Sequence, residues 1–298
     1  MKRLVLSCTL LFLALSARSQ TPIVAPDLSV ASRVSPAYFG PNAFPVPDVP
    51  DGRVQKDIYA EFAADFYQGT LSDGSDYTYD AFFRVRFPLF SRRASLELWM
   101  PVVEYWDFSP AVAAARNIPD AASRERWQGH DSGDIYVCTN IQILEGRANS
   151  LRPDILLRAV LKSASGNAFS HARFHDAAGY FFDGTLTWSR RFENSFLQEL
   201  RGGVNAGFLC WQTGTARQND AVQYGLVAIA DTHAFTLTTD YAGYVGWEGD
   251  GDHPRRIRLR LDGHLGRWMP FFQYTLGTND YPFHGFRAGI ACRFGVGL

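Results

Sequence analysis

Three arginines alternate with apolar residues in one short stretch near the C-terminus. Arg256, Arg258 and Arg260 are separated by Ile257 and Leu259. Side chains two residues apart on a β-strand project from the same face, so these guanidinium groups would form a row. Rows of arginine favour anionic solutes over cationic ones. If the row lines an open pore, the spacing therefore favours the passage of small anions.

Other stretches of alternating polarity carry further charges on the corresponding face. Charges of both signs on one face can pair across neighbouring strands. If the strands enclose a lumen, these side chains either fill it as a salt-bridged plug or line a narrow pore. The candidate lumen and selectivity residues are Arg84, Arg86, Arg158, Arg201, Arg256, Arg258, Arg260, Arg287, Arg293, Glu61, Asp65, Asp134, Asp183, Asp240 and Asp262.

Evidence for catalysis is weak by comparison. Ser170, His171 and His175 lie in one predicted loop, but a catalytic triad needs a nucleophile and base brought into hydrogen-bond contact by the fold. The His-x-Ser-Asn-Gly stretch of outer-membrane phospholipase A does not occur in the sequence. We therefore expect no enzyme activity and no catalytic residues. A lipid hydrolase that uses this loop is the least favoured alternative.

No cofactor and no resident metal are expected. Asp250 and Asp252 stand in a compact acidic loop, which offers oxygen ligands to calcium but lacks the EF-hand spacing. A solvated turn is the favoured interpretation of this loop. Cys138, Cys210 and Cys292 are far apart, so neither a disulfide framework nor a metal motif is expected. The formal net charge of −1 gives no basic face for nucleic acid.

The N-terminus has the features of a secretory signal peptide. Lys2 and Arg3 precede a short apolar run, and small residues stand before Gln20. The run is shorter than the roughly 20 residues that a membrane-spanning helix needs. We expect residues 1–19 to be removed by cleavage near Ser19 and Gln20.

The mature chain divides into an irregular part and a barrel part. Residues 20–53 contain seven of the 15 prolines, and proline cannot donate to a strand ladder. We interpret this segment as a periplasmic or lumen-lining lead-in that could also enter and block the lumen. From residue 54 to residue 298 the sequence alternates with a period of two, in runs too long for typical soluble strands.

The alternating runs predict an all-β fold with about 12 strands. The predicted strands cover residues 58–66, 80–89, 94–100, 134–143, 155–162, 180–188, 200–208, 223–230, 235–247, 256–262, 269–276 and 286–298. An even number of strands and alternately long and short connections are typical of a single antiparallel up-and-down transmembrane β-barrel. Aromatic residues near the strand ends predict an interfacial girdle formed by Tyr67, Trp106, Trp188, Trp211, Trp247 and Trp268.

Two short segments resemble a known group of proteins. They are Val34-Ser35-Pro36-Ala37-Tyr38-Phe39-Gly40-Pro41-Asn42-Ala43 and Gly179-Tyr180-Phe181-Phe182-Asp183. Both are similar to segments of uncharacterised, porin-like outer-membrane β-barrel proteins of Bacteroidota. The resemblance implies a location and a fold only, with no functional residues to carry over.

The favoured hypothesis is a monomeric barrel in the outer membrane of a Gram-negative bacterium, in contact with its lipid. It would act as a narrow channel for small solutes, anionic ones among them, through an arginine-rich lumen of mixed charge. The alternative is a closed structural or surface-interaction barrel without transport. In that case, the long loop from Ser109 to Ser132 would contact a partner or a polysaccharide.

Overall fold

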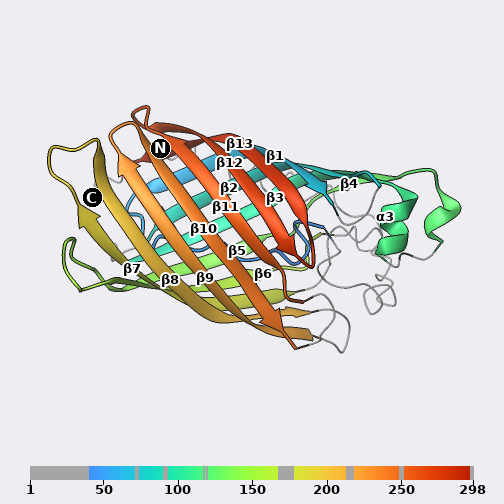
Figure 1. Ribbon diagram of the computed structural model, residues 1–298, viewed down its shortest axis with the longest axis horizontal. Helices are drawn as coiled ribbons and strands as arrows, with labels where there is room; N and C mark the ends of the chain where they lie inside the picture. The colour runs from blue at the N-terminus through green and yellow to red at the C-terminus, as the bar shows by residue number, and fades with distance from the viewer. Residues whose placement is uncertain are drawn as a thin grey trace.

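The computed structural model describes residues 40–70, 74–89, 93–116, 118, 120–166, 178–212, 218–247 and 252–295. Within these residues the chain forms a closed antiparallel barrel whose wall has 12 strands (Figure 1). The predicted fold class is therefore confirmed. The wall strands are β1 (Ile58–Gly69), β2 (Asp76–Pro88), β3 (Ala94–Phe108), β5 (Tyr136–Leu144), β6 (Asp154–Lys162), β7 (Gly179–Arg191), β8 (Leu197–Gln212), β9 (Gln218–Thr232), β10 (Phe235–Gly246), β11 (Arg255–Gly263), β12 (Trp268–Asn279) and β13 (Phe283–Phe294).

Closure of the wall depends on the first and last strands. β1 pairs with β13 over its whole length, from Ile58 opposite Phe294 to Gly69 opposite Phe283. On its other side β1 pairs with β2, and every further wall strand pairs with its neighbour in sequence. Closure gives the backbone amide and carbonyl groups of the wall partners within the barrel, as a hydrocarbon environment requires.

A shorter strand, β4 (Trp127–Asp131), lies outside this ring of 12. It pairs with the end of β3, from Glu104 to Phe108, whereas β5 pairs with the beginning of β3, from Ala94 to Trp99. β4 thus lies beside the part of β3 that extends past β5. The same connection carries helix α3 (Pro110–Ala115) and the 3-10 turn η2 (Ala121–Ser123).

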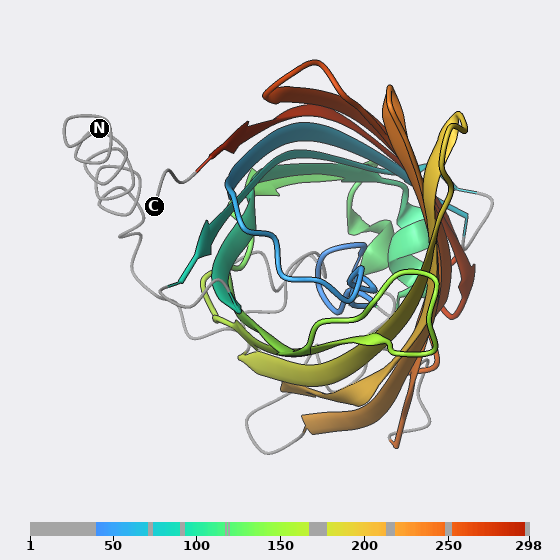
Figure 2. The ribbon, with the colours of Figure 1, turned by 90° about the vertical axis from the view of Figure 1, so that its left-hand side faces the viewer.

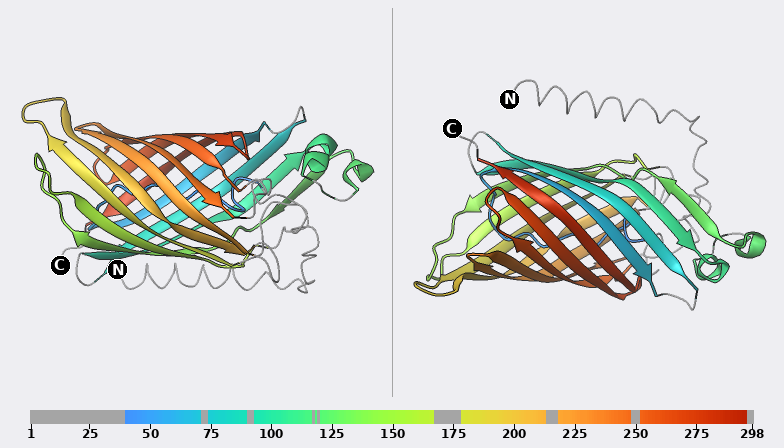
Figure 3. Two further views of the ribbon diagram at one scale, coloured as in Figure 1. Left: turned by 60° about the horizontal axis from the view of Figure 1, so that its bottom comes forward. Right: turned by 90° about the horizontal axis from the view of Figure 1, so that it is seen from above.

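The two ends of the barrel differ. We call the end that carries α3 and β4 the loop end; in Figure 3 it projects past the rim of the wall. The opposite end, called the turn end, has shorter connections such as residues 192–196, 233–234 and 264–267. The predicted alternation of long and short connections agrees with this arrangement.

The barrel is apolar outside and polar inside. On β11 the side chains of Ile257, Leu259 and Leu261 are 44%, 45% and 43% exposed, while those of the intervening arginines are buried. Phe62 on β1 is exposed in the same way, and its neighbour Glu61 is fully buried. This polarity is reversed relative to a soluble protein and matches a transmembrane β-barrel.

The lumen contains part of the chain. Figure 2 looks along the barrel and shows the N-terminal segment, drawn in blue, inside the ring of strands. We call residues 40–57 the lumen segment. Asn42 contacts β2 and β3 in the loop-end half, and Arg53 contacts β6 and β8 near the turn end. The segment therefore runs along the lumen before β1 begins at Ile58.

The prediction of an aromatic girdle is wrong for three of its six members. Trp106 and Trp211 are only 2% and 0% exposed and belong to an interior cluster, and Tyr67 lines the internal cavity. Trp188, Trp247 and Trp268 do lie on the exterior. The error arises because an apolar cluster fills part of the interior near the loop end, so aromatic residues there face inward.

Two further findings concern the ends of the chain and its helices. The predicted signal peptide and its cleavage site lie outside the described residues, as do residues 296–298 of the predicted last strand. No helix among the described residues is long and apolar enough to cross a membrane.

The exterior of β11 offers a test of its contact with lipid. Leu259 lies at the middle of this strand and faces outward. We predict that Leu259→Arg lowers the free energy of unfolding by about 2–4 kcal/mol, because a charge near the centre of the bilayer must leave water. Denaturant titration in phospholipid vesicles measures the loss, with Leu259→Phe as control. Equal stability of the two variants would contradict a lipid-facing position.

Candidate functional site

A cavity of about 1110 Å³ occupies the part of the lumen that the lumen segment leaves open. Its lining includes His233 and His264 from the turn end and Pro254 and Tyr281 from the loop end. Residues of the lumen segment itself form one side of the cavity. The cavity therefore extends along the barrel axis and is not confined to one end.

Arginines contribute much of the charge on this cavity. All nine arginines predicted from the sequence are among its lining residues: Arg84, Arg86, Arg158, Arg201, Arg256, Arg258, Arg260, Arg287 and Arg293. Arg293, near the turn end, is the most exposed of them, whereas the row on β11 is 6–9% exposed. The alternation of β11 thus brings its three guanidinium groups to one side of the lumen.

The predicted acidic residues lie differently. Of the six, Asp262 lines the cavity, whereas Glu61, Asp65, Asp183 and Asp240 are buried beside arginines and are not part of its surface. Asp134 lies elsewhere, just before β5, where it forms a buried ion pair with Lys162 and accepts from the amides of Ser165 and Gly166. The arginines consequently present their charge to the cavity more directly than the acids do.

The β11 row is fixed by partners on both sides. Arg258 donates to Asp240 on β10 at 2.5 Å, and Arg256 lies 3.1 Å from the same carboxylate. Arg260 binds Asp262 at 2.8 Å and also reaches Glu61 on β1 at 3.0 Å. These ion pairs hold extended side chains in place, so the row is a rigid feature of the wall.

Arg260 reaches β1 across β12 and β13 because the interior side of β13 is small. A Cβ atom at Gly289 would lie 2.8 Å from the Phe271 ring and 2.2 Å from the Phe62 carbonyl oxygen. Arg260 itself lies over the Phe271 ring at 3.9 Å. Arg287 on β13 also reaches β1, where it binds Asp65 through two hydrogen bonds of 2.6 Å.

Arg158 on β6 is held on the opposite side of the barrel from β11. It donates to Asp183 on β7 at 2.6 Å, and it stacks over Phe181 at 5.0 Å. Asn205 and Gln223 also donate to Asp183, each at 3.0 Å. Asp183 thus accepts from three side chains, and the Nη2 of Arg158 that donates to it also donates to a backbone carbonyl of the lumen segment.

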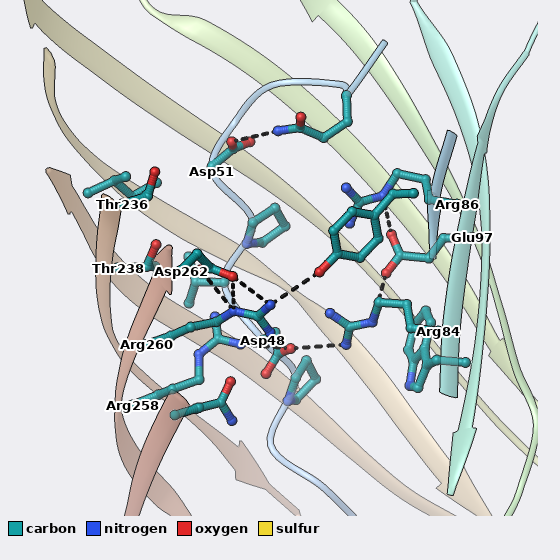
Figure 4. A pocket seen from close by; sticks show the side chains of 18 of the residues that line it. Asp48, Asp51, Arg84, Arg86, Glu97, Thr236, Thr238, Arg258, Arg260 and Asp262 are labelled. Atoms are coloured by element: carbon teal, nitrogen blue, oxygen red, sulfur yellow. Dashed lines mark hydrogen bonds and ion pairs between the residues drawn. The ribbon is translucent and has the colours of Figure 1, made fainter. Parts of the chain in front are cut away.

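The lumen segment contributes a carboxylate to the middle of this array. Asp48 accepts from Arg256 at 2.8 Å, lies 2.9 Å from Arg258 and lies 3.5 Å from Arg84 (Figure 4). Arg158 donates to the Asp48 backbone carbonyl at 2.7 Å. Burial alone would raise the pKa of Asp48, but Arg258, Arg256, Arg84 and Arg287 hold the pKa well below its ordinary value.

Near the turn end the segment is held by its own arginine, Arg53. Arg53 donates to Asp154 on β6 at 2.8 Å and to both oxygens of Glu199 on β8, at 3.0 and 3.2 Å. Burial lowers the pKa of Arg53, but the two carboxylates raise it above its ordinary value. The Val54 amide and the Gly52 carbonyl are both bound by the side chain of Gln142.

An apolar cluster, named here the loop-end cluster, packs across part of the lumen near the loop end. Phe44 of the lumen segment packs edge-on against Trp211 with ring centroids 6.2 Å apart, and Val112 and Ala113 of α3 are completely buried. The cluster's buried members are Ala43, Phe44, Trp106, Phe108, Val112, Ala113, Ile118, Trp127, Tyr136, Cys138, Val160, Phe181, Leu209, Trp211, Ala221 and Tyr244. Phe44 thus anchors the lumen segment in apolar packing near the loop end.

Sequence patterns did not identify Asp48, Arg53 or Glu199 as part of the site. Asp48 and Arg53 lie in the irregular segment, where no alternation assigns an inward face. The prolines around Asp48 were the available signal, because a segment with few amide donors can lie inside a barrel without a strand partner.

Other sequence candidates receive no support from the described residues. Ser170, His171, His175 and Asp250 lie outside them. Asp252 is buried near Gly246, and no group of three potential metal ligands occurs among the described residues.

Comparison with known proteins supports the fold. No protein-family model and no curated protein matches the sequence. A solved outer-membrane channel from Pseudomonas putida F1 superposes with a TM-score of 0.60 at 10% identity, covering 83% of this chain and 100% of that one. The transport unit of the autotransporter AIDA-I from Escherichia coli gives 0.54 at 7% identity, covering 92% and 98%.

Identities this low show a shared fold and nothing about activity. The porin-like barrel that the sequence resemblance implied is confirmed at that level. An affiliation with Bacteroidota stays a prediction.

The seating of the lumen segment can be tested at Gly52. Its φ of +80° is left-handed, and a Cβ there would lie 2.3 Å from Thr187 Oγ1 and 2.8 Å from Thr187 Cγ2. We predict that Gly52→Ala loosens the segment and lowers the free energy of unfolding by about 1–3 kcal/mol. Thermal unfolding in detergent and limited proteolysis of residues 40–57 measure these effects.

Gly266→Ala is the matched control. Gly266 has a φ of +65°, but nothing lies within 4 Å of an added Cβ. Both variants place an alanine in a left-handed backbone conformation, but only Gly52→Ala also introduces a steric clash. Equal losses of stability and equal protease resistance would contradict a tightly seated segment.

Proposed function

We propose that this protein is a channel of a Gram-negative outer membrane that admits small anionic solutes, with the lumen segment controlling passage. The observation that carries the proposal is the arginine-lined cavity of about 1110 Å³ inside a barrel with an apolar exterior. A barrel that only stabilised itself would gain nothing from a polar space of this size. The apolar exterior supports contact with membrane lipid.

Anion preference follows from the arrangement of charge. Guanidinium groups line the cavity, while Glu61, Asp65 and Asp240 lie behind them and neutralise their charge only in part at the surface. Fields inside a narrow, low-dielectric wall are screened less than those in open water. Of the described residues, twelve arginines and eight acidic residues line the cavity, so an entering anion meets an excess of positive charge.

Control by the lumen segment follows from its position. It spans the arginine array through Asp48 and enters the loop-end cluster through Phe44. Passage of a solute thus requires the segment to shift. Because the segment is attached to the wall by side-chain contacts and not by a strand ladder, it can move without opening the barrel.

A closed barrel without transport is the second candidate. The loop-end cluster supports it, since sixteen buried side chains from the wall, the lumen segment and the connection that carries α3 and β4 pack together near the loop end. In this case the connection that carries α3 and β4 would serve as a surface for a partner. The two candidates differ in whether ions cross the barrel.

Planar-bilayer recordings of the mature protein in a potassium chloride gradient test the proposal. We predict openings whose reversal potential favours chloride. Arg258→Gln is expected to reduce the chloride preference severalfold, because the row loses one charge while Asp240 keeps Arg256 as a partner. Arg258→Lys keeps the charge and should retain the preference. Absence of openings in all three proteins would contradict a channel and favour the closed barrel.

A further inference from the structure

Asp48 lies in the arginine array as a bound anion would. Its Oδ1 accepts from Arg256 at 2.8 Å, and its Oδ2 lies 2.9 Å from Arg258 and 3.5 Å from Arg84. Arg256 and Arg258 come from β11 and Arg84 from β2, so the carboxylate bridges separate parts of the wall (Figure 4). Guanidinium groups divided between two oxygens are a favourable arrangement for a carboxylate.

The wall alone leaves this array with excess positive charge. Arg256 and Arg258 share one carboxylate, that of Asp240, and Arg84 and Arg86 share another, that of Glu97. Four guanidinium groups thus face two wall carboxylates. Asp48 supplies a third from the lumen segment, and without it the array would have two unbalanced charges in a confined space.

The backbone around Asp48 contributes only carbonyl oxygens, which act as acceptors, to the contacts with these arginines. Arg256 donates to the carbonyl oxygens of Val46 and Pro47, at 3.3 and 3.2 Å, and Arg158 donates to the carbonyl of Asp48. Pro47 has no amide hydrogen to offer. The wall therefore recognises this stretch as a set of oxygen atoms around a carboxylate, which a small organic acid could also present.

The site is open to a solute. The Asp48 side chain keeps 36% of its surface exposed, and Asp48 and its arginine partners all line the cavity. A competing anion can thus reach the guanidinium groups from the cavity without first unfolding the wall.

We propose that Arg84, Arg256 and Arg258 form a carboxylate-binding site, and that Asp48 occupies it as an internal ligand. A solute that carries a carboxylate replaces Asp48 and thereby releases the middle of the lumen segment. The release step rests on the proposed channel function, whereas the binding site stands on its own geometry.

Replacement of Asp48 by alanine provides the test, because acetate has the size and charge of the deleted group. The full mature Asp48→Ala protein is unfolded by heat in detergent, in sodium acetate and in sodium chloride at equal ionic strength. A ligand that binds only the folded state raises the unfolding temperature. We expect acetate to produce a saturable upward shift in Asp48→Ala.

Three proteins serve as controls. Wild type and Asp48→Asn keep the site filled, so acetate should not shift either of them. The double variant Asp48→Ala/Arg258→Gln has lost a main donor and should lose the shift. If Asp48→Ala does not refold in chloride, the refolding yield in acetate replaces the temperature, and recovery in acetate is expected.

Equal acetate effects on Asp48→Ala, Asp48→Asn and wild type, or no effect on any of them, would overturn the site. Refolding that fails equally in acetate and chloride would do the same. The measurement involves no ion flow, so its outcome is independent of the conductance experiment. An acetate effect in a protein that never conducts would refute the channel and leave the carboxylate site standing.

Discussion

Each arginine buried inside this barrel needs an anionic partner, and the rest of the lumen is arranged around that requirement. A transmembrane barrel exposes its apolar side chains to lipid and keeps its charges inside. Buried guanidinium groups without a counter-charge would be costly. Glu61, Asp65 and Asp240 meet the need from within the wall, and Asp48 meets it from the lumen segment. Charge balance thus couples the wall to the lumen segment.

The two halves of the lumen have different roles in this account. Toward the loop end, aromatic and aliphatic side chains pack around Phe44 and α3. Between this cluster and the turn end, arginines and their partners line a cavity and hold the segment through Asp48 and Arg53. On this account, an entering anion would compete for the second set of contacts and not for the first. A solute would therefore act on the segment at the arginine array, and the loop-end cluster would follow.

Sequence periodicity predicted the wall well, because alternation along a strand is the direct consequence of one face in lipid and one in the lumen. The stretch from 256 to 262, for example, corresponds to β11 within one residue at each end. Prediction was poorer where this rule fails. The end of β3 was missed beyond residue 100, where Pro101 and a register shift opposite Ala81 interrupt the pattern, and Trp106 and Trp211 were assigned to the wrong face.

The site could be predicted only in part for a related reason. Alternation shows that Arg258 and Asp240 face inward, but not which of them reaches the cavity. Contacts such as that between Arg260 and Glu61 depend on strand register and on the small residue Gly289, which local patterns do not reveal. Asp48 lies in a segment without periodicity, so its position among the arginines could be determined only from the structure.

Cross-linking the lumen segment to the wall tests the central claim most directly. A Cβ atom at Gly225 would lie 2.4 Å from Val49 Cγ2, so cysteines at both positions are close enough to pair. The recording uses Val49→Cys/Gly225→Cys with the three native cysteines replaced by alanine, and Val49→Cys in the same background as control. The account predicts little conductance while the disulfide is present and chloride-selective openings after reduction. Equal conductance before and after reduction, with the disulfide shown by mass spectrometry, would contradict it.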